Sequence, residues 1–204
     1  MNTSLEAIQE FWCWFQEHRG EFDILTDTAA PFWDLALKRL QRLDKRLWFE
    51  LSQPDGNDRE FIITAEGHVD VFPLAESVVA YAPEIRGWQF VALKPPRGFD
   101  FKTTYEGIRF EPGAMWFLPL ECSSTPEELG LRVAVPDFTE NIERQTMNAV
   151  MVILETALGE RAAAVDIQYL EVVKLPESPE SHDYIKLPQL SDYIAWRKKR
   201  RRSQ

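Results

Sequence analysis

The chain has 204 residues, of which 45% are hydrophobic and 27% are charged, with 13 prolines, 9 glycines and 2 cysteines. This composition is typical of a globular protein and excludes a disordered chain or a fibrous repeat. The longest stretch without a charged side chain, residues 145–154, is far shorter than the roughly 20 residues of a membrane-spanning helix. We therefore expect a globular protein with no membrane span, and the sequence shows no internal repeat.

The net charge of −10 is unevenly distributed along the chain. Six of the 23 basic residues form one run near the C-terminus: Arg197, Lys198, Lys199, Arg200, Arg201 and Arg202. Without them, 17 basic residues face 33 acidic ones, which leaves a body with a charge of −16. Such a body attracts basic partners and repels nucleic acids and anionic membranes, whereas the tail does the opposite.

The cysteines and the N-terminus indicate a reducing compartment. Cys13 and Cys122 are far apart and belong to no C-x-x-C motif, which favours two reduced thiols over one disulfide. The N-terminus has no basic region followed by an apolar one, so a secretory signal is not expected. The prediction is a cytoplasmic protein.

In the first half of the chain, apolar periodicity predicts two helices, over residues 5–18 and about 31–47, which form an antiparallel hairpin. Trp14 lies well away from the apolar stripe of the first helix, so it either packs on another element or is exposed. We further expect the elements of the following segment to be a β-hairpin over 47–64 with its turn at 53–58, a helix over 72–82 and a strand over 88–93.

The second half is predicted to contain a hairpin whose strands, 103–110 and 114–120, flank Glu111-Pro112-Gly113. A strand over 129–135, a helix over 140–158 and a strand over 165–173 follow. Short connections favour antiparallel pairing. The predicted fold class is α+β: the N-terminal helical hairpin, then a mainly antiparallel sheet of about six or seven strands packed by two further helices. Residues 1–175 form one domain, and 176–204 form a linker and a basic tail.

The motifs of common catalytic and metal sites are missing from the sequence. It contains neither a phosphate-binding glycine loop nor a dinucleotide fingerprint, so no cofactor is predicted. His18, His68 and His182 are each isolated, which argues against a metal site. Neither cysteine lies in a thiol-nucleophile signature, and the hydroxyls at 123–125 lack the glycines of a nucleophile elbow. No catalytic residue is assigned.

A weak candidate ligand site is the loop over residues 94–102, where cations alternate with aromatic rings. Stacking combined with charge can hold a nucleotide or a single strand, although the loop is also compatible with a structural role. Its candidate binding residues, together with one tryptophan of the first helix, are Lys94, Arg97, Phe99, Phe101, Lys102 and Trp14.

Paired carboxylates are a second weak candidate. Glu50 is predicted on the first strand and Glu121 at a strand end, and the two would face each other across the sheet. Such a pair is one way to build a hydrolase, but two solvated surface acids explain it equally well.

The basic tail, Arg197–Arg202, admits three interpretations. It contacts a polyanion through salt-sensitive charge attraction, it docks on the acidic body or on a partner, or it serves only solubility. A short helix after residue 187 is compatible with docking, whereas a loosely docked, fraying tail is the alternative.

Several short motifs resemble an uncharacterised bacterial domain family. They are Phe11-Trp12-x-Trp14-Phe15, Leu47-x-Phe49-Glu50, Ile63-Thr64-Ala65-Glu66-Gly67, Ala82-Pro83 with its spacing to Trp88, and Leu158-Gly159-Glu160. The resemblance covers about residues 5–175 and excludes the basic tail. It implies a bacterial, cytoplasmic α+β domain, and it brings no activity and no catalytic residue.

From these observations we expect a non-catalytic interaction or accessory domain whose acidic body binds a basic protein partner, or a homodimer. Nucleic acid is expected to bind only through the tail. One alternative is a small-molecule or nucleotide-binding module that uses the 94–102 loop, and another is a hydrolase-type enzyme that uses acidic residues. A sheet with one bare face would indicate a binding surface.

Overall fold

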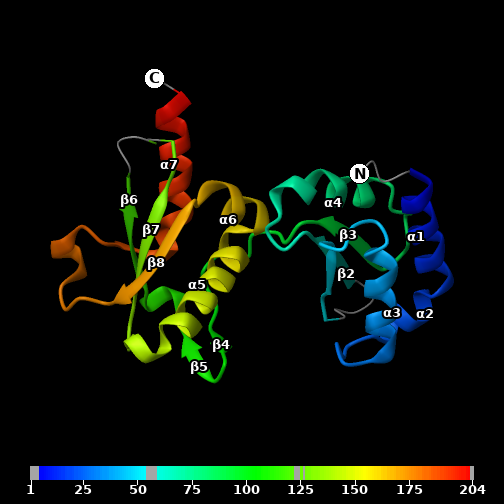
Figure 1. Ribbon diagram of the computed structural model, residues 1–204, viewed down its shortest axis with the longest axis horizontal. Coiled ribbons are helices and arrows are strands. Elements are labelled where there is room, and N and C mark those ends of the chain that lie inside the picture. Colours follow the sequence, from blue (N-terminus) through cyan, green and yellow to red (C-terminus); the bar gives the residue numbers. More distant parts are fainter. Residues whose placement is uncertain (1–4, 54–58, 122–124, 126, 203–204) are drawn as a thin grey trace. The chain divides into compact units, whose positions relative to one another are not determined.

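The computed structural model describes residues 5–53, 59–121, 125 and 127–202, so Cys122 and most of the predicted 53–58 turn lie outside the described residues. The chain divides into two compact units, Met1–Lys94 and Pro95–Gln204. This division differs from the predicted domain of residues 1–175 with a separate tail. Each unit is described by itself below (Figure 1).

The first unit combines helices with a three-stranded sheet. Its elements are α1 (Leu5–Glu17), α2 (Arg19–Ile24), α3 (Pro31–Leu40), β1 (Trp48–Leu51), β2 (Arg59–Thr64), η1 (Val69–Val71), α4 (Phe72–Ala80) and β3 (Trp88–Ala92). The strand order is β1-β2-β3, with β1 antiparallel and β3 parallel to β2.

Aromatic rings fill the core of the first unit. The ring of Phe15 lies 4.3 Å from that of Phe22 on α2 and 5.3 Å from those of Phe61 and Phe90 on the sheet. This packing explains the helix-spaced aromatic run near the N-terminus, whose large rings dominate the buried surface. Arg59 is also buried there, at 5% exposure, and donates hydrogen bonds to the carbonyl oxygens of Phe22 and Leu25.

The second unit has a four-stranded sheet, a separate two-stranded sheet and three helices among its described residues. Its elements are β4 (Thr103–Tyr105), β5 (Ile108–Phe110), η2 (Pro112–Ala114), β6 (Trp116–Leu120), β7 (Gly130–Val135), η3 (Glu140–Ile142), α5 (Glu143–Leu158), α6 (Glu160–Asp166), β8 (Tyr169–Lys174), η4 (Pro179–His182), β9 (Ile185–Lys186), η5 (Leu187–Gln189) and α7 (Leu190–Arg202). The larger sheet has the order β8-β7-β6-β9, in which β7 and β8 are parallel.

The core of the second unit lies on one face of this sheet. Phe117, Val133 and Val172 from the three longer strands join one cluster with apolar residues of α5 and α7. Because successive strand residues point to opposite faces, their neighbours Leu118, Arg132 and Glu171 point away from that cluster.

The α+β class is confirmed, but the single sheet and the helical hairpin are wrong. The strands form three sheets of three, two and four strands. The N-terminal segment has three helices. The last of them, α3, ends at Leu40, and in the turn that follows it the Asp44 carboxylate accepts a hydrogen bond from the backbone N–H of Arg46. The 103–110 hairpin turns at Glu106-Gly107, where both residues have positive φ, and not at Glu111-Pro112-Gly113.

Both units follow the same order of elements. In each, an antiparallel strand pair is followed by a 3-10 turn, a helical connection and a third strand parallel to the second. The connection is α4 in the first unit and α5 with α6 in the second. The 3-10 turn begins five residues after the second strand in both cases, at Val69 after Thr64 and at Glu140 after Val135. A parallel strand must be reached by a crossover, and these helices supply it.

No helix among the described residues is long and apolar enough to cross a membrane.

Candidate functional site

Trp14 is a core residue of the first unit. It is 6% exposed, and its ring lies 4.6 Å from that of His18 and 5.8 Å from that of Phe32. Of the two alternatives for this side chain, the structure has the packed one, which leaves little of the ring accessible to a ligand.

The candidate residues of the 94–102 loop belong to both units. Lys94 belongs to the first unit, where its ammonium group pairs with Glu50 at 3.2 Å and Glu66 at 3.1 Å. The other four belong to the second unit, where Phe99 is buried in the core, Phe101 packs against it and Lys102 pairs with Glu111 at 2.9 Å.

Arg97 is exposed, and its backbone N–H donates to the carbonyl oxygen of Thr156 near the end of α5. This hydrogen bond, like the ring contacts of the loop, ties residues 97–102 to the second unit.

The basic run forms the end of α7 and contacts its own unit. Arg197 donates to the carbonyl oxygens of Glu127 and Glu128, and Arg201 also donates to that of Glu127. The Lys198 ammonium group lies 2.6 Å from the Asp166 carboxylate. Apolar residues hold the same helix, since Leu190 and Ile194 are buried in the core cluster.

The remaining basic side chains of this helix are exposed where they are described. Lys199 and Arg200 reach the surface, and the Arg200 guanidinium lies 5.5 Å from the centre of the Trp196 ring. For Arg202, the structure describes the backbone alone. Part of the run is therefore built into the fold, while the rest stays at the surface.

The predicted carboxylate pair is not formed within one sheet. Glu50 lies on β1 of the first unit, and Glu121 follows β6 of the second. Within the described part of the chain, no three His, Cys, Asp or Glu side chains are placed to hold a metal ion.

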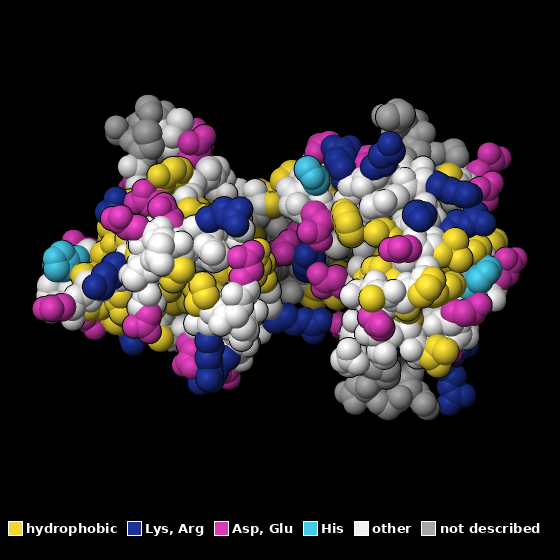
Figure 2. Space-filling model, turned by 60° about the horizontal axis from the view of Figure 1, so that its bottom comes forward, with side chains coloured by type: hydrophobic (Ala, Val, Ile, Leu, Met, Phe, Trp, Pro, Cys, Tyr) yellow, Lys and Arg dark blue, Asp and Glu magenta, His cyan; other side chains and the backbone are white. Residues whose placement is uncertain are grey.

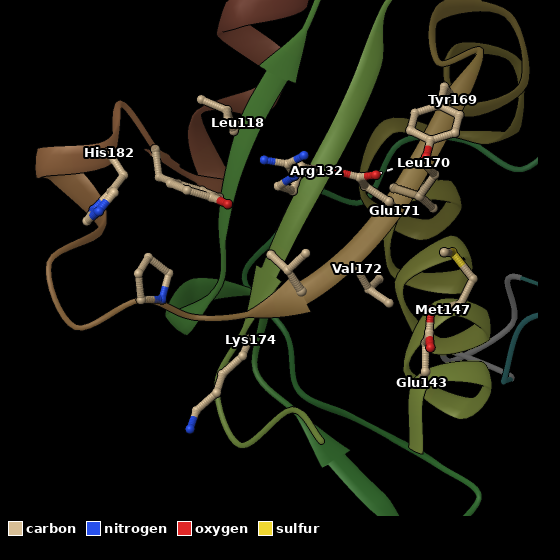
Figure 3. Close-up of a pocket in the computed structure, with 13 residues that line it drawn as sticks. Leu118, Arg132, Glu143, Met147, Tyr169, Leu170, Glu171, Val172, Lys174 and His182 are labelled. Atoms are coloured by element: carbon tan, nitrogen blue, oxygen red, sulfur yellow. Dashed lines mark hydrogen bonds and ion pairs between the residues drawn. The ribbon is translucent and has the colours of Figure 1, made fainter. Parts of the chain in front are cut away.

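An open hollow of about 820 Å³ follows strand β8 of the second unit (Figure 3). All six residues of β8 line it, together with neighbours from the sheet, α5 and the segment after β8: Leu118, Arg132, Glu143, Met147, Pro176, His182 and Tyr184. In the described sheet, β8 has a strand neighbour on one side only. Because alternate residues of a strand point to opposite faces, a hollow lined by all six must follow the free edge.

The two sides of this edge differ in chemistry. On the α5 side lie Leu170, Val172 and Met147, which form an apolar wall. On the opposite side lie Arg132 and Glu171, which point toward each other from neighbouring strands in Figure 3. The α5 side of the hollow is thus mainly apolar, with Glu143 at the start of the helix as its acid, and the opposite side of the strand is charged.

A hydrogen-bonded network fixes the charged side. The Arg132 guanidinium donates to one carboxylate oxygen of Glu171, and the Tyr169 hydroxyl donates to the other at 2.9 Å. The hydrogen bond from Arg132 is the main cause that lowers the pKa of Glu171, and the same contact raises the pKa of Arg132. The hydrogen bond to Glu171 raises the pKa of Tyr169. The two hydrogen bonds hold Arg132, Glu171 and Tyr169 together, although the Tyr169 side chain is 54% exposed to solvent.

Sequence reasoning missed this site for two reasons. The strand was predicted over 165–173, whereas residues up to Asp166 form α6. Its parallel pairing with β7 was not foreseen, so Arg132 and Glu171, which lie 39 positions apart, were not brought together. A signal was present: one strand, a long helix and a second strand in that order form a parallel pair with a crossover.

The chain matches no protein-family model, no curated protein and no solved structure.

Proposed function

We propose that this protein is a non-catalytic interaction domain that binds an extended, basic segment of a protein partner along the free edge of β8. The segment adds a strand to the sheet of the second unit. Peptide groups of β8 supply hydrogen bonds that do not depend on sequence, and side chains on the two sides of the edge supply selectivity.

The observation that carries this proposal is that every residue of an edge strand lines one open hollow. An exposed strand edge presents N–H and C=O groups to pairing with another chain. Six residues offer about 20 Å of edge, enough for an incoming strand of ordinary length.

The apolar and charged sides of the hollow determine which side chains suit the partner segment. Alternate side chains of the incoming strand face Met147, Leu170 and Val172, so apolar residues suit those positions. The intervening side chains meet the charged side. The expected partner therefore alternates apolar with polar residues.

Charge favours a basic partner. The whole chain has a net charge of −10, which speeds the approach of a positively charged segment. Over the surface shown in Figure 2, acidic and basic side chains are interspersed, so a local acid must complete the selection. Glu143 is exposed at the start of α5 and lines the hollow, where it is available to a cation of the partner.

The Glu171 carboxylate is better suited to binding than to acid–base chemistry. Its pKa is lowered by Arg132, and a carboxylate stabilised as an anion is a weaker base. Its two oxygens already accept hydrogen bonds from Arg132 and Tyr169. This arrangement supports a rigid recognition surface.

The test is titration of the full-length, isotope-labelled protein with three synthetic peptides, followed by amide NMR. The first alternates Val and Lys, the second alternates Val and Glu, and the third is the Val/Lys peptide with prolines that remove backbone N–H donors. We expect the first to shift the amide signals of Tyr169–Lys174 and to bind less tightly at high salt. The other two should leave these signals in place.

Two charge reversals provide a matched comparison. Glu143→Lys changes a residue that lines the hollow, whereas Glu140→Lys changes an exposed acid three positions earlier that does not. We expect the first to weaken binding of the Val/Lys peptide about fivefold, as for one surface charge pair, and the second to have little effect. Equal binding of the acidic and basic peptides, or no response of β8 to any of them, would refute the proposal.

A further inference from the structure

The C-terminal turns of α7 carry the part of the basic run that the fold does not bury. They lie at an extremity of the second unit (Figure 1). Lys199, Arg200 and Arg201 are exposed there, and Trp196, about one turn earlier, is 52% exposed. An exposed tryptophan beside several cations combines two ways of binding on one helix end, charge attraction for a polyanion and a flat ring for stacking.

Trp196 and Arg200 form one surface that is supported from the core. They are four positions apart, which places them on the same face of the helix. The Arg200 guanidinium lies 5.5 Å from the centre of the Trp196 ring. The Tyr193 ring lies 5.6 Å from that of Trp196 and 5.6 Å from that of the core residue Phe117. Unpaired nucleic-acid bases stack on aromatic rings and on guanidinium planes, and this surface offers both.

The contact that holds Arg201 leaves its charge available. Its guanidinium donates a hydrogen bond to the backbone carbonyl oxygen of Glu127 at 3.0 Å. Because a carbonyl oxygen carries no net charge, the contact orients the guanidinium without neutralising it. A guanidinium has five N–H donors, so others remain for the oxygens of a phosphate. Lys198 differs, because its ammonium group pairs with the Asp166 carboxylate.

The charges that act on Tyr193 show the local balance at this surface. Burial raises the pKa of the Tyr193 hydroxyl and Glu121 raises it further, whereas Arg197 and Arg200 lower it. Two cations and one acid therefore act on this ring. The whole chain has a net charge of −10, which disfavours contact of a polyanion with a wider part of the surface.

The apolar residues of α7 argue against a membrane as the occupant. A helix that lies in a membrane surface inserts its apolar face among the lipids. In α7 the apolar residues Leu190 and Ile194 are buried in the core of the unit. Trp196 is the one large apolar side chain that is exposed on the described part of this helix. A broad anionic membrane would also repel the acidic remainder of the chain, whereas a single strand is narrow enough to contact the helix end alone.

We propose that the exposed end of α7 binds a single-stranded nucleic acid, with one base stacked on Trp196 and phosphates held by Arg200 and Arg201. The binding does not depend on base sequence, because stacking and charge do not read the edges of the bases. It requires an unpaired base, which a single strand offers and a duplex does not. These residues differ from those of the β8 edge, so the two proposals stand or fall separately.

The test titrates the full-length protein at low salt with a fluorescently labelled oligothymidylate of about twelve nucleotides, which forms no base pairs. Fluorescence anisotropy gives the dissociation constant, and NMR of the indole N–H groups locates the contact. The Trp196 signal is identified by its absence from Trp196→Leu, and we expect it to shift on binding. The logarithm of the association constant should fall with the logarithm of the salt concentration with a slope of about −1.4, as for two phosphate contacts of a single strand.

A first pair of variants measures stacking. Trp196→Leu should weaken binding of the oligothymidylate about tenfold, the usual contribution of one stacked base. It should not weaken binding of inorganic polyphosphate, which has no bases, and this second ligand also shows that the variant is folded. Trp48→Leu changes a similarly exposed tryptophan on β1 of the first unit and should leave both affinities unchanged.

A second pair measures charge. Arg201→Gln should weaken binding of the oligothymidylate and of polyphosphate about threefold each. It should also reduce the size of the salt slope by about 0.7, since one phosphate contact is lost. Arg42→Gln, at an exposed position of the first unit, removes the same charge and should do neither.

Three results would overturn the proposal. The first is no binding of the oligothymidylate at low salt, and the second is an equal loss of affinity in Trp196→Leu and Trp48→Leu. The third is a Trp196 signal that responds to vesicles containing phosphatidylserine but not to the oligothymidylate, which would assign this surface to a membrane. None of these results concerns the residues of β8.

Discussion

The guanidinium group of Arg197 donates a hydrogen bond to the backbone carbonyl oxygen of Glu128 at 2.7 Å. This contact joins the C-terminal helix to the segment that leads into β7, and Arg197 is only 9% exposed. One member of the basic run therefore stabilises the fold of its own unit. Among the three interpretations of the tail, docking on its own body has direct structural support.

Replacing Arg197 should therefore affect stability more than replacing its neighbours. Arg197→Met leaves two carbonyl oxygens without their charged donor, and we expect the free energy of unfolding to fall by about 2 kcal/mol. Urea denaturation measures this change. Arg200→Met, at an exposed position of the same helix beside the exposed Trp196 ring, should change it by less than about 1 kcal/mol. Equal effects of the two substitutions would mean that the Arg197 contacts contribute nothing.

Arg59 has a comparable role in the first unit. Its guanidinium donates to the carbonyl oxygens of Phe22 and Leu25, at the end of α2, and to that of Ser52. Burial lowers the pKa of this guanidinium, because the loss of hydration disfavours its charged form. Arg59→Met should destabilise the protein by about 3 kcal/mol in urea denaturation, because several carbonyl oxygens lose their donor.

Arg42→Met is the control for that substitution, since Arg42 is exposed. It should leave the urea midpoint nearly unchanged. A drop as large as that of Arg59→Met would show that general loss of charge, and not the buried contacts, is responsible.

The Asp44–Arg46 pair predicts an acid-dependent loss of stability. Hydrogen bonds from Arg46 lower the pKa of Asp44 from 3.8 to about 2. Because the folded-state pKa is below the unfolded one, the pair stabilises the fold above about pH 4, and this contribution disappears as the pH falls toward 2. Asp44→Asn should reduce stability near pH 7 by no more than about 1 kcal/mol, as for other surface pairs.

Urea denaturation of both proteins across this pH range checks the prediction. The stability difference between wild type and Asp44→Asn should shrink steadily below pH 4. A difference that stays constant down to pH 2 would show that the ionised carboxylate does not cause it. Asp34→Asn, on the exposed side of α3, controls for the general loss of negative charge.

The network beside β8 makes a spectroscopic prediction. The hydrogen bond from Tyr169 to Glu171 raises the pKa of the tyrosine above 10.0. Glu171→Gln removes the negative charge that opposes ionisation, so the pKa of Tyr169 should fall. NMR titration of the tyrosine ring signals measures it. Glu180→Gln, an exposed acid of η4, should not move it, and an unchanged pKa in Glu171→Gln would contradict the geometry of the pair.

Local patterns predicted most elements of the fold. Helices α1, α4 and α5 and the β1–β2 hairpin agree with their predicted positions to within a few residues, because apolar periodicity and proline stops report local structure. The pairing of strands was not predictable in this way. Apolar periodicity predicts which residues face the core, but it does not predict whether β3 pairs with β2 in a parallel or an antiparallel direction.

The boundaries of α3 and β8 show how local chemistry overrides periodicity. The leucine pattern continues to Leu47, but the side chain of Asp44 accepts backbone and side-chain hydrogen bonds from Arg46 and stabilises a turn. Before β8, residues 160–166 contain three successive alanines, which favour the helix α6 over a strand.

The candidate site was harder to predict than the elements. Its charged pair is formed by two residues on parallel strands that are joined by α5 and α6, and neither residue belongs to a known motif. The loop and tail candidates were chosen for their composition, but composition does not reveal that Phe99 is buried in the core or that Arg197 contacts backbone carbonyls.

The two units share one order of strands and helices, so the sequences of corresponding elements can be compared between them. Both halves reach their third strand through a helical connection, yet that strand is Trp-Gln-Phe-Val-Ala in the first and Tyr-Leu-Glu-Val-Val-Lys in the second. The architecture evidently tolerates a strand of uncharged residues at this position. The shared strand order therefore does not require the pair of Glu171 and Arg132, which leaves this pair available for the recognition proposed for the second unit.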